Sequence, residues 1–303
     1  MDRGDCRSYN QVMKRIFSYM AMLLVAGCTV DHKNEYDPSM KLMFQPVMHV
    51  ASKAVTGENY PAGQPFAINA WTSDGQTYIS GGTVAVDEEG AWTLEDGTLW
   101  PDRSKRLTVI GYTPAEAFAS CTDTEGVTCT YDILQSQTDL LYSDPQADLD
   151  KVECGGIVFV PFRHALCQMD FEVKNRVAKD EEIIIKSIKV DGIKPEGAFH
   201  SLPEPEWKAD GDPVEVLFFE GGQSTRNVPD RIGTTWYIVP QALSTNVTVE
   251  YEYRTAYDTG FTTTMKTCAL QTNLKPGRHY TYTLSVGIDD VKFLLEIIED
   301  RFK

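Results

Sequence analysis

The feature that most constrains the fold is a succession of short alternating runs separated by turn sequences. In VTVEYEY (247–253), the Val and Tyr residues fall on one face of an extended chain. Alternation with a period of two is typical of strands that bury one face. Between the runs, TSDGQ, DEEG and LKPG supply the residues that tight turns need. We find no helical pattern as long as three turns, so the sequence predicts an all-β protein.

The number of runs and the length of the chain predict two domains. A chain of 303 residues is too long for one small domain, and many short strands with regular turns favour β-sandwiches. One run ends and another begins within FRHALCQ (162–168), so we place the boundary at about residue 165 and expect tandem β-sandwiches over 40–165 and 166–303. The expected strands are 40–50, 65–72, 83–86, 106–113, 127–132, 138–143 and 156–162, then 166–175, 182–190, 214–219, 234–240, 246–254, 261–270, 279–286 and 291–298.

The N-terminal region has the pattern of an export signal. In MKRIFSYMAMLLVAGC (13–28), two basic residues precede an apolar run, 16–25, that is too short to span a bilayer but suits a signal-peptide core. Small residues then precede Cys28. This resembles a bacterial lipobox, in which the cysteine thiol receives a diacylglycerol and the new N-terminus is acylated, for example with palmitate. We expect a signal peptide over 1–27 and a lipoprotein anchored through Cys28.

Two alternatives remain for this region. Cys28 could follow a transmembrane stub by chance, and translation could begin at Met13, because residues 1–12 carry no export pattern. The polar segment 29–39, TVDHKNEYDPS, is interpreted as a tether, so that 28–39 form a lipidated linker to the first domain.

The charge of the chain limits its partners. The segment before Cys28 has four basic and two acidic residues, which leaves 24 basic and 42 acidic residues and a formal net charge of −18. Such a chain repels phosphate backbones, so we expect no nucleic acid partner. Charge would not hold it on an anionic membrane surface either.

The cysteines left after Cys28 are odd in number, which argues against a complete disulfide framework. Cys121 and Cys129 bracket the segment CTDTEGVTC. They either close a small disulfide loop in an oxidising compartment or remain free and partly buried. Cys167 and Cys268 lie in strand-like runs and are interpreted as core residues.

The sequence contains none of the common catalytic patterns. We find no G-x-S-x-G, C-x-x-C, H-E-x-x-H, P-loop or dinucleotide fingerprint. The histidines show no zinc spacing, and His164 is interpreted as a hydrogen-bonded structural residue at the domain boundary. Acidic clusters at 87–89, 180–182 and 289–290 lie beside turns and are interpreted as solvated charge. We therefore expect no enzyme, no cofactor and no metal site.

The tryptophans allow two interpretations. They could stack on sugars, or they could pack in the sandwich cores, which we favour. The segment TLWPDRSKRLTVIGYTP (98–114) in particular has the pattern of a Trp–Pro turn that leads into a core strand. The five residues are Trp71, Trp92, Trp100, Trp207 and Trp236.

An ordered set of motifs resembles the fimbrillin (Mfa-like) family of surface lipoproteins, which includes subunits of type V pili. The motifs are MFQPVMHVASKAV, FAINAW, TLWPDRSKRLTVIGYTP, QSQTDLLYS, GGIVFVPFRHALCQMDFEV and LKPGRHYTYTLSVG, and they cover the chain from about 40 to 287. The resemblance implies two transthyretin-like (Ig-like) β-sandwich domains and a role in a fimbrium or a related adhesin at the cell outer membrane.

The resemblance also implies a route of assembly. A protease cuts just beyond the first strand, that strand is lost, and a donor strand from another subunit fills the open groove by β-augmentation. In this sequence the first strand is Met40–Val50, and the cut would fall between Lys53 and Ala54; the family frequently has Arg at the cut. The run VKFLLEII (291–298) is either a donor strand or, as we favour, the last core strand.

Three functions follow as hypotheses. The first is a pilus subunit in the shaft, tip or anchor, with other pilus subunits, a surface receptor or glycan, and the outer membrane as partners. The second is a non-polymerising surface lipoprotein that binds glycans. The third, a hydrolase, has no motif in its favour.

Overall fold

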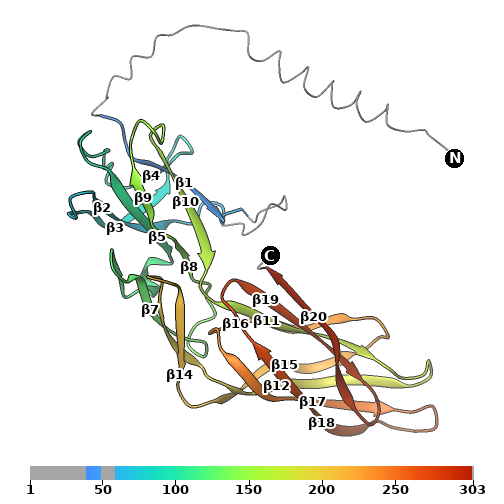
Figure 1. Cartoon of the computed structure of the whole chain (residues 1–303). Helices are drawn as coiled ribbons and strands as arrows, with labels where there is room; N and C mark the ends of the chain where they lie inside the picture. Colours follow the sequence, from blue (N-terminus) through green and yellow to red (C-terminus); the bar gives the residue numbers. More distant parts are fainter. Residues whose placement is uncertain (1–38, 49–58, 302–303) are drawn as a thin grey trace, which may run out of the picture. The chain divides into compact units, whose positions relative to one another are not determined.

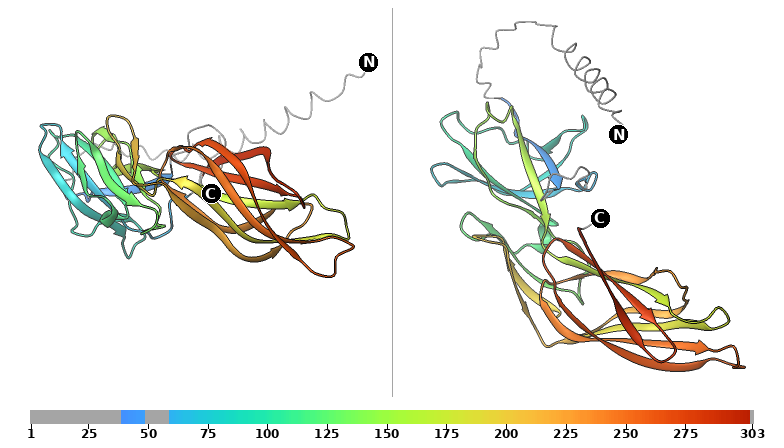
Figure 2. Two further views of the ribbon diagram at one scale, coloured as in Figure 1. Left: turned by 90° about the horizontal axis from the view of Figure 1, so that it is seen from below. Right: turned by 45° about the vertical axis from the view of Figure 1, so that its right-hand side comes forward.

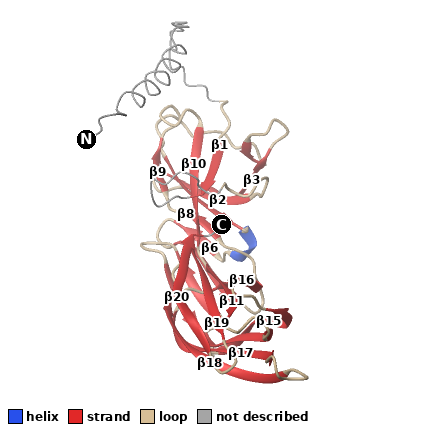
Figure 3. Ribbon diagram, turned by 90° about the vertical axis from the view of Figure 1, so that its right-hand side faces the viewer, coloured by secondary structure: helices blue, strands red, loops and turns tan. Residues whose placement is uncertain are grey.

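The computed structural model describes residues 39–48 and 59–301, and strands make up almost all of the regular structure there (Figure 3). The exception in these ranges is the 3-10 turn η1 (Ala115–Ala117). The all-β class is confirmed. No helix in the described ranges is long and apolar enough to cross a membrane. The strands are β1 (Met43–Met48), β2 (Phe66–Thr72), β3 (Thr77–Val86), β4 (Trp92–Leu94), β5 (Leu107–Thr113), β6 (Ser120–Thr122), β7 (Gly126–Asp132), β8 (Leu141–Ser143), β9 (Gln146–Leu149), β10 (Ile157–His164), β11 (Cys167–Asn175), β12 (Glu182–Ile193), β13 (Glu196–His200), β14 (Glu206–Asp210), β15 (Val214–Ser224), β16 (Asp230–Ile238), β17 (Ala242–Arg254), β18 (Thr262–Asn273), β19 (Arg278–Val286) and β20 (Val291–Arg301).

The strands before residue 165, apart from β6 and β7, form a sheet that closes on itself. Its order is β2-β3-β4-β1-β10-β8-β5-β9, and β2 also pairs with β5 along Ala67–Thr72. The expected sandwich of separate sheets is therefore replaced here by one curled sheet around its own core.

Two features allow this sheet to curl. The β2–β3 register shifts near Ala70, which bends the pair. Gly111 of β5 leaves space for β10, because a Cβ there would lie 2.7 Å from Val160 Cγ1.

The strands after residue 165, apart from β13 and β14, form two further sheets that pack face to face (Figures 1 and 2). Their orders are β16-β11-β19-β20 and β15-β12-β17-β18. Phe171 of β11 meets Phe218 of β15 edge-on across the layers, with ring centroids 5.0 Å apart. The run at 291–298 lies within β20, which pairs antiparallel with β19 at the edge of its sheet. This pairing agrees with its interpretation as the last core strand.

A fourth sheet crosses the expected boundary at residue 165. Its order is β14-β13-β7-β6, and β7 pairs with β13 from Thr128↔His200 to Asp132↔Glu196. On its inner face, Trp207 of β14 packs on Phe199 of β13 and donates its indole N–H to the carbonyl of Ala165 at 2.6 Å. The described strands on either side of the boundary are therefore joined by a shared sheet as well as by the chain.

Candidate functional site

The first strand lies inside the closed sheet rather than at a free edge. β1 runs parallel to β10, with Met43 opposite Ile157 and Met48 opposite Phe162. On its other side it pairs antiparallel with β4. The closed sheet depends on β1, since no other described strand joins β4 to β10. Without β1, the ring would open between these two strands.

Alternate side chains of the first strand enter the core. Leu42 is fully buried and Phe44 is 3% exposed. Phe44 meets Phe66 of β2 edge-on, with ring centroids 6.2 Å apart. Gln45, between the inward positions, is exposed. This is the alternation expected of a strand with one face on a core, and it means that β1 fills apolar pockets as well as pairing its backbone.

An aromatic cluster surrounds the inward face of the first strand. Tyr60, just beyond the undescribed segment, is buried against Phe162, with ring centroids 4.8 Å apart. Its ring also lies 5.7 Å from the rings of both Phe66 and Trp92. Burial raises the pKa of Tyr60 well above its ordinary value, so the phenol stays neutral. The cluster therefore offers large, uncharged surface to whatever strand occupies the slot between β4 and β10.

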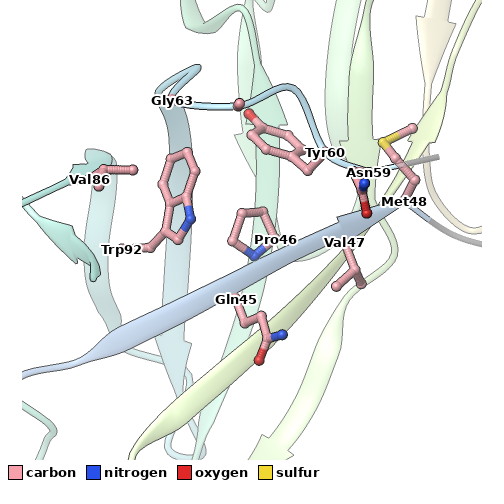
Figure 4. A pocket seen from close by; sticks show the side chains of 10 residues that line it. Gln45, Pro46, Val47, Met48, Asn59, Tyr60, Gly63, Val86 and Trp92 are labelled. Atoms are coloured by element: carbon pink, nitrogen blue, oxygen red, sulfur yellow. The ribbon is translucent and has the colours of Figure 1, made fainter. Parts of the chain in front are cut away.

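A pocket of about 600 Å³ lies beside the second half of β1 (Figure 4). Pro46, Trp92 and Tyr60 lie on one side of the β1 ribbon, while Gln45 and Val47 point to the other side. Because side chains from both faces of β1 line the pocket, it follows the edge of the strand. The lining is Gln45, Pro46, Val47, Met48, Asn59, Tyr60, Ala62, Gly63, Val86 and Trp92.

Sequence reasoning did not identify this pocket. Tyr60 lies in NYPAGQP, which is short, contains two prolines and a glycine, and has no strand alternation. The signal that could have found it is an aromatic residue just before a fully buried strand, β2. Trp92 was noted only as one of several tryptophans. Its place beside β1 depends on the β3–β4 hairpin, in which Trp92 pairs with Val86.

The predicted processing residues lie outside the described ranges. Cys28 belongs to the N-terminal part, and Lys53 and Ala54 fall between Met48 and Asn59. Lipidation at Cys28 and cleavage after Lys53 therefore stay predictions.

Other polar residues make structural contacts. His164 shares a hydrogen bond between its Nδ1 and Asp139 Oδ2 at 2.6 Å, as predicted. Asp170, 2% exposed, accepts hydrogen bonds from His279 and Thr235 and pairs with Arg231. In the described part of the chain, no group of three His, Cys, Asp or Glu side chains could hold a metal ion.

The tryptophans pack as predicted. Trp71 and Trp100 are buried, with 8% and 4% of their surface exposed. Trp92, Trp207 and Trp236 are partly buried against the cores.

The two candidate disulfide cysteines are free thiols. Cys121 of β6 is opposite Val127, so Cys129, two residues further along β7, is its diagonal neighbour. Diagonal Cα atoms are about 7–8 Å apart, whereas disulfides need about 4.4–6.8 Å. Burial raises the pKa of each thiol to about 12, which also suppresses the reactive thiolate. Cys167 is fully buried and Cys268 packs partly against the core, as predicted.

These cysteines give a first testable prediction. Denatured without a reductant, the protein should be alkylated at both Cys121 and Cys129, because neither is oxidised in the fold. Peptide mass spectrometry measures this directly. An unmodified pair that becomes reactive only after reduction would contradict the free-thiol arrangement.

Comparisons with known proteins agree with this architecture. A family model described as fimbrillin-like matches residues 52–298. No curated protein sequence matches the chain. Among solved structures, a fimbrial protein from Bacteroides vulgatus is 17% identical, with a TM-score of 0.67 over 87% of this chain and 99% of that one. A candidate cell adhesion protein from Bacteroides uniformis is 14% identical, with a TM-score of 0.57 over 87% of this chain and 99% of its own.

At these identities the solved structures show a shared fold. The family model, in contrast, covers most of the chain and includes both the β1-to-β2 connection and most of β20. The chain therefore belongs to the fimbrillin-like family.

Proposed function

We propose that the chain is a surface-exposed fimbrial subunit of the type V pilus kind. It is exported with a signal peptide, held in the outer membrane as a precursor through lipid on Cys28, and assembled by β-strand donation after cleavage removes its first strand together with Cys28. Family membership supports the fimbrial role, and so do structural relatives that are named as fimbrial or candidate cell adhesion proteins. No enzymatic activity is needed for this role.

The position of β1 is the observation that carries the proposal. β1 is the only described strand between β4 and β10, and Phe44 of β1 and Leu42 just before it fill buried pockets. Removal of β1 would expose the unpaired edge of β10 from Ile157 to Phe162 and leave those pockets empty. A strand from another subunit would restore both the backbone hydrogen bonds and the buried side chains. An open edge with empty apolar pockets is therefore a strong acceptor.

The proposed cut between Lys53 and Ala54 lies five residues beyond the end of β1. A cut there would separate β1 from the rest of the chain without touching any described strand. We further propose that 40–165 and 166–303 correspond to the family's two transthyretin-like domains, with the β14-β13-β7-β6 sheet bridging them.

The glycan-binding alternative has less support. None of the five tryptophans is exposed enough to form a sugar platform, because all pack wholly or partly in the cores. A pilus anchor remains compatible with the same fold, and it differs from a shaft subunit in keeping β1 and Cys28 together.

The test is the N-terminus of the protein recovered from the cell surface, measured by mass spectrometry. We expect a chain that begins at Ala54, with β1 absent. Unboiled samples should then show a ladder in SDS gels, since donated strands dissociate slowly. A surface protein that begins at acylated Cys28, with no ladder, would instead favour an anchor or a non-polymerising lipoprotein.

A further inference from the structure

We infer that the pocket beside β1 is an entry site, where an incoming strand first binds before it takes the place of β1. The inference rests on the proposed function and adds the location of the first step. The occupant is the leading part of the incoming strand, an extended and uncharged peptide segment.

The pairing of β1 is uneven along its length. β10 pairs with β1 over all of Met43–Met48, but β4 pairs only with Met43 and Phe44. Beyond Phe44, no described strand pairs with the β4-facing edge of β1. The pocket lies along this edge, from Gln45 to Met48. Among the described residues, the pocket is therefore the open end of the slot that β1 fills.

The size and composition of the opening favour a short extended segment. The edge from Gln45 to Met48 is four residues long, about 13 Å at a strand rise of about 3.3 Å per residue. None of the described lining residues is charged, in a chain that is 24% charged. Trp92, Val86 and Met48 supply apolar walls, and the amides of Asn59 and Gln45 can pair with an exposed backbone. A charged segment would lose its hydration there with no partner.

The rest of the slot is inaccessible to an incoming strand while β1 is in place. Leu42 and Phe44 fill its inner part, and β4 covers their edge. A strand held in the pocket lies next to this slot, so its exchange with β1 becomes an intramolecular step at high effective concentration. Blocking the pocket should therefore slow strand uptake while leaving the finished complex unchanged.

Val86 and Ala62 allow the pocket to be blocked without disturbing the core. Val86 is 43% exposed at the end of β3, and Ala62 is exposed in the segment before β2. Val86→Glu would place a carboxylate in the pocket, and Ala62→Glu would do the same from another part of its lining. Val228→Glu is the matched control, because Val228 is 51% exposed and lies away from the pocket.

The experiment uses the full mature chain with a specific protease site in place of residues 51–53, so that cutting does not depend on natural processing. The probe is a fluorescent peptide of residues 42–48, the uncharged part of the chain's own first strand. After cutting, its uptake and its later release are followed by fluorescence anisotropy. We expect Val86→Glu and Ala62→Glu to slow uptake about tenfold or more, with release unchanged. Val228→Glu should change neither rate.

The outcomes separate the two proposals. If the unmodified chain takes up the peptide but both pocket variants do so at the same rate, the entry site is wrong and strand donation stands. If the variants accelerate release as much as they slow uptake, the pocket belongs to the final complex, and the entry role is also overturned. If the unmodified chain takes up no peptide, strand donation itself fails and the entry site with it.

Discussion

Phe44→Ala should lower the free energy of unfolding of the uncut chain by about 3–5 kcal/mol. Phe44 is 3% exposed, and its ring packs on Phe66 within the apolar core of the closed sheet. Alanine would leave a cavity that the surrounding strands cannot easily fill, because β10 and β4 hold β1 in register. The loss therefore includes both the buried apolar surface and the cavity.

Phe159→Ala is the matched control for this prediction. Phe159 is on β10, next to β1, but 56% of its surface is exposed. Its replacement should change the free energy of unfolding by less than about 0.5 kcal/mol. Urea denaturation followed by tryptophan fluorescence compares the two variants. Equal losses of unfolding free energy in the two variants would mean that β1 is not part of the stable core. The slot between β4 and β10 would then bind a donor strand only weakly.

The core strands rich in apolar residues could be predicted from sequence because their pattern is local. The segments expected at 65–72, 106–113 and 166–175 coincide within one residue with β2, β5 and β11. In each of them the buried positions are apolar, apart from a few such as Asp170. The family motifs were recognisable for the same reason, since they sample these core strands in order.

The short strands were missed because their formation depends on distant partners. β13 (EGAFH) was not among the expected strands, because Pro195 precedes it and Gly197 lies within it. Gly197 is needed there because a Cβ would lie 2.6 Å from Val239 Cγ1 and 3.0 Å from Trp207. β14 (EWKAD) alternates polar and apolar residues, but over only five residues, which is too short a run to stand out in the sequence. β14 becomes a strand by pairing with β13, and β13 also pairs with β7.

Closure of the first sheet also could not be predicted, and the entry site depends on it. Nothing local in FAINAWT or RLTVIGYT shows that these two strands pair with each other and so complete a ring. The pocket arises where the short β4 ends before β1 does. That difference in length is a property of two strands that lie about fifty residues apart in the sequence, and neither run reveals it alone.

Asp170→Asn should lower the free energy of unfolding by about 3 kcal/mol at neutral pH. Asp170 is 2% exposed, and one of its carboxylate oxygens meets Arg231 at 2.8 Å and His279 at 3.0 Å. Burial alone would raise the pKa of Asp170, but the hydrogen bonds, led by that of His279, outweigh it and leave the pKa below its ordinary value. The amide removes the charge that these partners face.

The same contacts predict how this loss depends on pH. A carboxyl whose pKa is lower in the folded protein stabilises the fold above its unfolded pKa of about 3.9 and loses that effect as pH falls through its folded pKa. The difference in unfolding free energy between the original chain and Asp170→Asn should therefore be constant near neutral pH and shrink below about pH 4.

Asp180→Asn, at an exposed position, is the control and should lower the free energy of unfolding by less than about 0.5 kcal/mol throughout. Urea denaturation between pH 7 and pH 3.5 measures both. A difference for Asp170→Asn that stays the same across this range would mean that the charge of Asp170 does not stabilise the fold, and its contacts with Arg231 and His279 would then act through packing alone.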